Sequence, residues 1–325
     1  MGYATGRTMP NLLCAGLAML AGIALAEGDV NVPRPVEELE RELATDPFRI
    51  ERAEISRPKA QGDITLKADV SFDGRPAYRV KLRRAEPGAD SFNNRPRYDL
   101  AAYELQKLFL SPAEYVVPAT ALRMMPLAEL APYAPAAAPT FRGSDEVLVV
   151  LQYWLQEVKV IADVYDPAKF EADPVYARHI GQLNVLTWLI EHGDSNTGNF
   201  LISRAPAGQR VYSIDNGVAF ALNDSDRGQL WKDLRVDRLP ADVVERLRAV
   251  TREELERRLS AVAEWQLRDG RWMAVPPGQS LSAMRGVREK KGTVQLGLTR
   301  AEIDGVAKQL EKLLARVDDG KIKTY

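Results

Sequence analysis

The spacing of hydrophobic and polar positions changes about halfway along the chain. Residues 64–72 alternate apolar and polar side chains with a period of two, and residues 77–83 do the same after Asp73-Gly74. Two alternating runs around Asp-Gly predict a β-hairpin. Residues 118–124 predict a further strand, and the apolar run at residues 146–155 predicts a buried one.

The second half of the chain is dominated by helical spacing. Residues 175–192 are apolar on every side, which predicts a helix buried within the core. Two short strands are expected at residues 199–204 and 210–214, on either side of a Pro- and Gly-containing turn. The other helices are predicted at residues 36–43, 97–110, 241–267 and 299–317, and residues 126–140, rich in Pro and Ala, predict a loop or linker.

These patterns predict an α+β protein with two parts. A polar extension at residues 27–47 precedes a strand-rich part at 48–155, and a helix-rich part follows at 156–325. The length of 325 residues is sufficient for two lobes. No transmembrane segment is predicted after residue 26.

Residues 1–26 have the pattern of a signal peptide. Arg7 precedes an apolar run at residues 12–25, and Ala24 and Ala26 place small side chains before a cleavage point. An uncleaved anchor is the alternative. Cys14, the single cysteine, lies inside this segment, so the mature chain would contain none and would form no disulfide. We therefore expect a bacterial periplasmic or secreted protein.

The charge balance argues against a nucleic-acid partner. The chain has 44 basic and 45 acidic residues, with a formal net charge of -1. A nucleic-acid-binding surface usually leaves a basic excess.

The strongest chemical pattern combines two loop segments. Asp194 and Asn199 are separated by four residues in Glu-His-Gly-Asp-Ser-Asn-Thr-Gly-Asn, and Asp215 opens an Asp-Asn-Gly tripeptide shortly afterwards. The order and spacing are those of a kinase-type site, in which one carboxylate orients a hydroxyl and the other two side chains hold Mg²⁺ on phosphates. Ordinary turns are the alternative explanation for each segment alone.

These motifs resemble those of atypical protein-kinase-like proteins. The His192 to Asn199 segment is similar to the HGDxxxGN loop of aminoglycoside and choline phosphotransferases. The Ile214 to Gly217 segment resembles secretory-pathway kinases and phosphatidylinositol-kinase-like families. The resemblance covers roughly residues 60–265 and implies a bilobal protein-kinase-like fold, with 48–155 as the N-lobe and 156–325 as the C-lobe. No GxGxxG loop precedes Lys81, a departure from the fuller pattern of protein kinases.

The resemblance also implies a role for each candidate residue. Asp194 would orient the acceptor hydroxyl, while Asn199 and Asp215 would hold Mg²⁺ or Mn²⁺. Lys81 would neutralise ATP phosphates, held by a carboxylate from the following helix. Asp99 and Glu104 are both candidates for that carboxylate. Arg79 and Arg83 lie on the same strand face as Lys81, so any of the three cations can face the site.

The implied activity is transfer of the ATP γ-phosphoryl group to a hydroxyl on a protein, sugar or lipid head group. Three alternatives remain open at this point: a catalytically inactive pseudokinase that serves as an envelope scaffold, a nucleotidyl transferase on the same fold, and an exported α+β binding protein without catalysis. An exported kinase also needs a nucleotide source outside the cytoplasm. Convergence of the three motif residues opposite Lys81 would count against the binding protein.

Overall fold

The structure is a computed structural model that describes residues 1–2, 31, 35–56, 65–91, 95–220, 228 and 230–325. The predicted signal peptide lies outside these residues, apart from Met1 and Gly2. Within the described part, no helix is both long enough and apolar enough to cross a bilayer. The fold mixes helices with several sheets, which confirms the α+β prediction at that level.

The first half of the chain builds one antiparallel sheet with strand order β1-β2-β3-β5-β4. Its β2 strand buries every second residue, as the alternating pattern predicts. Gly74 adopts φ +72° in the turn to β3, a conformation that glycine takes without steric cost. The strands are β1 (Phe48–Ile55), β2 (Thr65–Phe72), β3 (Tyr78–Arg84), β4 (Thr120–Pro126) and β5 (Glu146–Tyr153).

Helices cover this sheet because its inner strand β5, which lies between β3 and β4, is buried on both faces. Every residue of β5 is buried. Helix α2 (Pro96–Gln106) packs against β4 and β5, and α1 (Val36–Ala44) packs against the same two strands. The predicted linker contains a short helix, α3 (Leu127–Leu130), whose Leu130 is buried, so this segment is part of the core rather than a free connection.

The middle of the chain forms a buried helix followed by a small sheet. Helix α5 (Pro174–Leu189) is buried over most of its surface, as its continuous apolar pattern predicts. Asp173 begins it by accepting hydrogen bonds from the backbone N–H groups of Val175 and Tyr176. The neighbouring elements are β6 (Val158–Lys159), α4 (Pro167–Ala172), β7 (Phe200–Ser203) and β8 (Val211–Ser213), and the sheet order is β6-β7-β8.

The last third of the chain differs from its prediction. The helix expected at residues 241–267 is two helices, and the chain then turns into a four-stranded sheet of order β11-β10-β13-β12. The predicted final helix is present and has a capping box between Thr299 and Glu302. The elements are β9 (Arg238–Leu239), α6 (Ala241–Ala249), α7 (Arg252–Leu259), β10 (Ala263–Arg268), β11 (Arg271–Val275), β12 (Val287–Lys290), β13 (Thr293–Leu296), α8 (Arg300–Asp318) and β14 (Lys323–Thr324).

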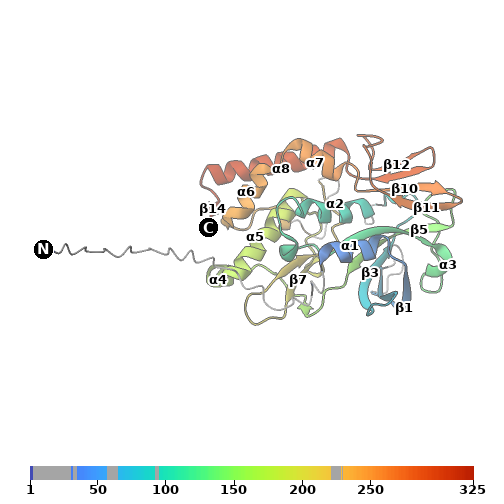
Figure 1. Cartoon of the computed structure of the whole chain (residues 1–325), viewed down its shortest axis with the longest axis horizontal. Coiled ribbons are helices and arrows are strands. Elements are labelled where there is room, and N and C mark those ends of the chain that lie inside the picture. The colour runs from blue at the N-terminus through green and yellow to red at the C-terminus, as the bar shows by residue number, and fades with distance from the viewer. Residues whose placement is uncertain (3–30, 32–34, 57–64, 92–94, 221–227, 229) are drawn as a thin grey trace.

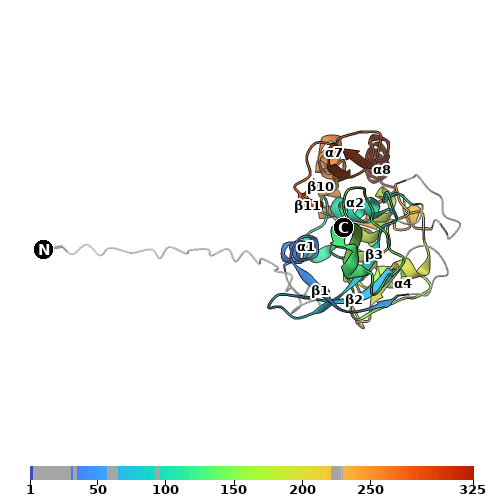
Figure 2. The ribbon, with the colours of Figure 1, turned by 90° about the vertical axis from the view of Figure 1, so that its right-hand side faces the viewer.

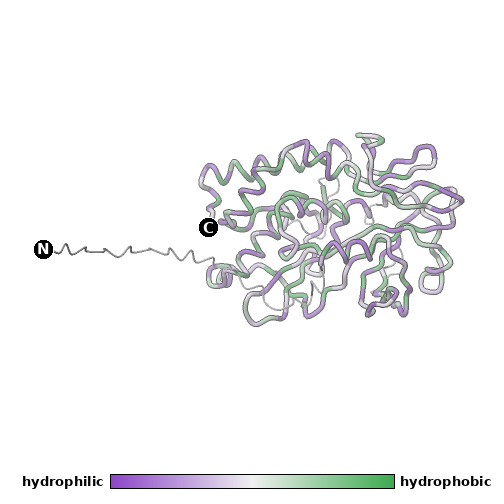
Figure 3. The backbone as a smooth tube through the Cα atoms, viewed as in Figure 1, coloured by the Kyte–Doolittle hydropathy of each residue, from purple (hydrophilic) through white to green (hydrophobic). Residues whose placement is uncertain are grey.

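This last third packs back onto the first. Figures 1 and 2 show α2 between the first sheet and the pair α7 and α8, while β10 and β11 lie beside α2 and the first sheet. Apolar side chains line the inside of this arrangement, and α8 alternates apolar and polar residues along its length (Figure 3). The buried apolar residues form one continuous cluster from Leu39 to Ile322.

Candidate functional site

The first motif segment joins α5 to β7 and is held by backbone hydrogen bonds. The N–H groups of His192 and Gly193 donate to the carbonyls of Thr187 and Val218, at 2.9 Å each. The Asp194 N–H donates to His192 Nδ1 at 3.4 Å. His192 is fully buried with its ring centroid 5.1 Å from that of Phe200. His192 therefore orients the loop.

Burial sets the protonation state of this histidine. It lowers the pKa of His192 to about 4, because a charged imidazole loses its hydration in the core. The ring is neutral at pH 7, and its Nδ1 atom accepts the Asp194 hydrogen bond, so the proton belongs on Nε2.

Asn199 links the two motif segments. Its Nδ2 atom donates to the Asp194 carbonyl at 3.0 Å, and its own carbonyl accepts the Ile214 N–H at 2.9 Å. Within the described residues its Oδ1 atom accepts no hydrogen bond. A side-chain amide oxygen in this position is the kind of hard ligand that Mg²⁺ prefers.

Asp215 occupies an unusual backbone conformation beside these bonds. Its φ angle is +60°, in the left-handed region that Asp and Asn enter more readily than most other residues. The adjacent Asn216 is buried and accepts a 2.7 Å hydrogen bond from the Ser213 hydroxyl, which fixes the turn. Such strained positions concentrate at functional sites. The Asp215 side chain remains 43% exposed, so its carboxylate is accessible.

Two cations of β3 reach the Asp215 carboxylate. Lys81 Nζ lies 3.5 Å from Oδ1, and Arg83 Nη1 lies 2.7 Å from the same atom. Period-two geometry places both side chains on one face of the strand. The third cation on that face, Arg79, pairs instead with Asp69 on β2 at 2.8 Å.

Arg83 also bonds to Asp99, which makes it the link between three elements. Its guanidinium is 2% exposed and joins Asp99 on α2 to Asp215 through two different nitrogens. Burial raises the pKa of Asp99, so its ionised form depends on the guanidinium of Arg83. The helix partner of the cation is therefore Asp99, and the cation bonded to it is Arg83 rather than Lys81.

Glu104, the second candidate for that partner, lies elsewhere. Five residues along a helix turn a side chain about 140° away from Asp99. Glu104 bonds to Lys107 at 2.6 Å and to Arg258 of α7 at 2.8 Å. The structure thus brings Lys81 and Asp99 together with Asp215 and Arg83. It links Asp194 and Asn199 to this group through the Ile214 backbone and leaves Glu104 out.

The described residues contain no group of three or more His, Cys, Asp or Glu side chains that can hold a metal ion by themselves. The oxygens of Asn199 and Asp215 fit a hard divalent cation, but two protein ligands leave most of its coordination to phosphate oxygens and water. A site of this composition suits a cation that arrives with a phosphorylated substrate.

The comparisons with known proteins do not assign this chain to a family. No protein-family model matches this sequence, and no curated protein is detectably similar to it.

Proposed function

We propose that this chain has a bilobal protein-kinase-like fold and transfers the γ-phosphoryl group of ATP to a hydroxyl acceptor. The first sheet with α2 would be the N-lobe, and α5 with the β6-β7-β8 sheet would begin the C-lobe. The observation that supports the proposal is a connected set of contacts: Asn199 bonds the Asp194 carbonyl and the N–H of Ile214, and the next residue, Asp215, pairs with Lys81 and Arg83. These links between the two segments count against the reading of the motifs as unrelated turns.

In the proposed phosphoryl transfer, each of these residues would have a separate role. Asp194 would orient the acceptor hydroxyl and take its proton as the hydroxyl oxygen forms a bond to the γ-phosphorus. The bond from that phosphorus to the bridging oxygen would break, and ADP would leave with the bonding electrons. Lys81 and Arg83 would offset phosphate charge, and Asn199 Oδ1 and Asp215 would hold Mg²⁺. When bound, Mg²⁺ supplies charge neutralisation on the phosphates.

One observation favours a pseudokinase as the second candidate. The Asp215 carboxylate that a metal would need is engaged by two cations at 2.7 and 3.5 Å. If those ion pairs persist in the presence of nucleotide, the site binds nucleotide without catalysing transfer.

We also propose that the protein is exported, as a bacterial periplasmic or secreted protein. This part of the proposal rests on the sequence of residues 1–26. The proposed acceptor is a hydroxyl group on a protein, a sugar or a lipid head group.

The first experiment measures nucleotide binding by thermal unfolding with and without ATP and Mg²⁺ or Mn²⁺. A ligand at 100 times its dissociation constant adds about 2.7 kcal/mol to the free energy of unfolding. We expect a metal-dependent rise in melting temperature that disappears in Asp215→Ala. Asp69→Ala is the matched control, because Asp69 is also an ion-paired aspartate but lies on β2, outside the site. No shift with any nucleotide and metal would refute the proposed activity.

Transfer of label then separates the remaining candidates. Label that moves from the γ-position of ATP to an acceptor indicates phosphoryl transfer, and label from the α-position indicates nucleotidyl transfer. Asp194→Asn is expected to keep the metal-dependent thermal shift but to lose transfer by a factor of at least about 100, the usual contribution of a positioned acid–base group. Binding without any transfer would favour the pseudokinase.

A further inference from the structure

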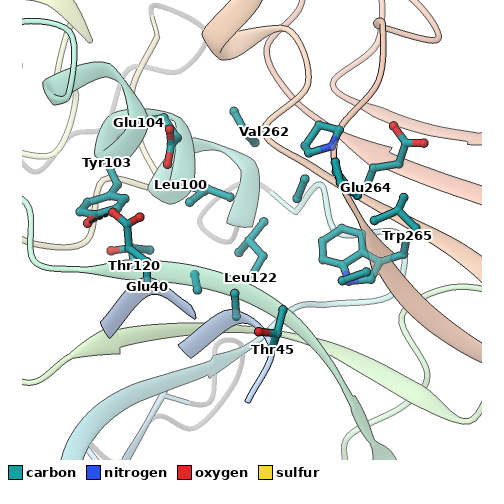
Figure 4. A pocket seen from close by; sticks show the side chains of 17 residues that line it. Glu40, Thr45, Leu100, Tyr103, Glu104, Thr120, Leu122, Val262, Glu264 and Trp265 are labelled. Carbon is teal, nitrogen blue, oxygen red and sulfur yellow. Dashed lines mark hydrogen bonds between the residues drawn. The ribbon is translucent and has the colours of Figure 1, made fainter. Parts of the chain in front are cut away.

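A pocket with a volume of about 390 Å³ lies between the first and the last parts of the chain. Its walls come from α1, α2 and β4 in the first part and from β10 and β11 in the last part. Figure 4 shows side chains from both parts pointing into one space between α2 and the β10 strand. The residues that line it are not those of the proposed phosphotransfer site, so the pocket is a separate feature of the fold.

The middle of the pocket is apolar. Leu100 of α2, Leu122 of β4 and Val262 line it (Figure 4). Small-molecule sites are typically apolar cavities of roughly 300–1,000 Å³ with a few placed polar groups. A cavity of this volume and lining therefore suits the apolar body of a small molecule.

The carboxylates around the pocket are already engaged or point away from it. Glu40 and Glu104 are both ion-paired with Lys107, at 2.9 and 2.6 Å. Glu264 precedes Trp265 on β10, so its side chain leaves the strand on the opposite face from the indole ring. A neutral ligand therefore fits this lining better than a charged one.

Trp265 brings a hydrogen-bond donor to the apolar lining. Its ring points into the space between α2 and β10 (Figure 4), and the residue is only 2% exposed. In the part of the chain that the structure describes, its Nε1–H donates no hydrogen bond to the protein, yet Nε1 is not one of the enclosed atoms that lack a partner. This N–H is therefore open to the pocket. A buried indole N–H usually has a partner, and here a ligand can supply it.

We propose that this pocket binds a neutral, largely apolar molecule with one hydrogen-bond acceptor, of the aryl ketone class. The carbonyl oxygen would accept the Trp265 Nε1–H, and the apolar body would contact Leu100, Leu122 and Val262. Such a ligand buries apolar surface and gives the indole N–H the partner that the protein does not provide. The proposal does not depend on phosphotransfer.

Two probes of the same shape test the hydrogen bond. Acetophenone carries the carbonyl oxygen, and α-methylstyrene has a methylene group in its place. Each is titrated into the full chain, and binding is followed through the ¹⁵N–¹H signals of the five tryptophan indoles, with Trp265 assigned by its loss in Trp265→Phe. We expect both probes to bind and the Trp265 signal to shift most with acetophenone. Failure of both probes to bind would overturn the proposal.

Trp265→Phe then isolates the hydrogen bond, because it keeps an aromatic ring and removes the N–H. The variant should weaken acetophenone about fivefold, the effect of one hydrogen bond, and change α-methylstyrene by less than about twofold. Comparison of the two changes cancels the greater hydration of the free ketone. Trp272→Phe is the matched control: it removes an indole N–H of β11 outside the pocket and should leave both affinities unchanged. Equal changes for the two probes in Trp265→Phe would refute the assigned hydrogen bond.

Ala274→Trp locates the binding. Ala274 is exposed, lines the pocket and lies directly opposite Trp265 in the register of β10 and β11, so its side chain shares a sheet face with the indole. A large ring at this position should abolish the binding of both probes, while the exposed site leaves the unfolding midpoint near that of the wild type. Binding that survives in Ala274→Trp would place the probes elsewhere and contradict the assignment.

Discussion

His192 shows how burial of one side chain makes stability depend on pH. The folded-state pKa of about 4 lies below the ordinary value of 6.5. Above pH 6.5 neither state binds the proton, and the folded protein has its full stability. As the pH falls below 6.5, His192 becomes protonated in the unfolded chain but stays neutral in the folded protein. The free energy of unfolding therefore decreases until the folded ring is also protonated near pH 4.

We therefore expect the free energy of unfolding to fall by about 3 kcal/mol from this residue between pH 7 and pH 4. Urea unfolding at several pH values measures it. His192→Asn replaces the imidazole with a group that does not titrate, while its side-chain oxygen can still accept the Asp194 N–H. The variant should have a shallower pH dependence over the same interval. Equal slopes for variant and wild type would show that His192 is not the titrating group.

The candidate site was largely predictable at the residue scale. Asp194 and Asn199 are joined by one short turn, and the β7–β8 hairpin returns the chain from Asn199 to Ile214 and Asp215, so the local spacing that links them is visible in the sequence. The choice between Lys81 and Arg83 was not visible. Both lie on the same strand face, and only the position of α2 in space selects Arg83 as the partner of Asp99.

At the scale of elements, Asp173 is the residue on which the start of α5 depends. Its carboxylate accepts hydrogen bonds from the Val175 and Tyr176 N–H groups at 3.0 Å, and from the Gly208 N–H in the β7–β8 turn at 2.9 Å. One side chain thus caps the central helix and holds the hairpin that follows the first motif.

Asp173→Ala should lower the free energy of unfolding by about 1–2 kcal/mol, the upper part of the range for a lost N-cap, because the turn loses an acceptor as well. Asp173→Asn should retain most of this stability, since asparagine caps helices comparably. Chemical denaturation of the two variants beside the wild type measures the difference. A loss as large in Asp173→Asn as in Asp173→Ala would mean that the charge, and not the cap, stabilises the helix.

Elements were predictable where one periodicity persisted. The β2–β3 hairpin, α5 and α8 all combine a regular pattern with a recognisable turn or cap. The prediction of one helix at residues 241–267 was wrong after Leu259, because Ser260 ends α7 and the chain continues as β10. The sheet at residues 263–296 was missed since its strands are short and mostly part-exposed. Only a few of their side chains, such as Trp265 and Val294, are fully buried.

At the scale of the whole molecule, one buried ion pair joins the two ends of the fold. Arg97, in the first turn of α2, bonds to both carboxylate oxygens of Glu302 in α8, at 3.0 and 2.8 Å. Tyr98 donates to the same carboxylate, and the Arg97 guanidinium lies 4.2 Å from the Tyr98 ring centroid. These contacts hold α8 against the helix that carries Asp99.

Glu302→Ala should lower the free energy of unfolding by about 3 kcal/mol, because it removes the bidentate partner of a buried guanidinium and leaves Arg97 only the half-exposed Asp90 at 3.5 Å. Urea denaturation measures this loss. Glu254→Ala is the matched control: Glu254 has the same position after a threonine cap in α7 but faces solvent, and its loss should cost less than about 1 kcal/mol. Replacement of both partners, Arg97→Met with Glu302→Met, should be less destabilising than Glu302→Ala alone. Equal losses for Glu302→Ala and Glu254→Ala would contradict the role of the pair.

The same ion pair constrains the order in which the chain can fold during its synthesis. Arg97 and Glu302 are 205 residues apart in sequence. When the ribosome has made everything before α8, Arg97 has only the half-exposed Asp90 as a counter-charge, at 3.5 Å. Its buried bidentate partner is added last, so a chain interrupted before α8 lacks the carboxylate that closes the core around this guanidinium.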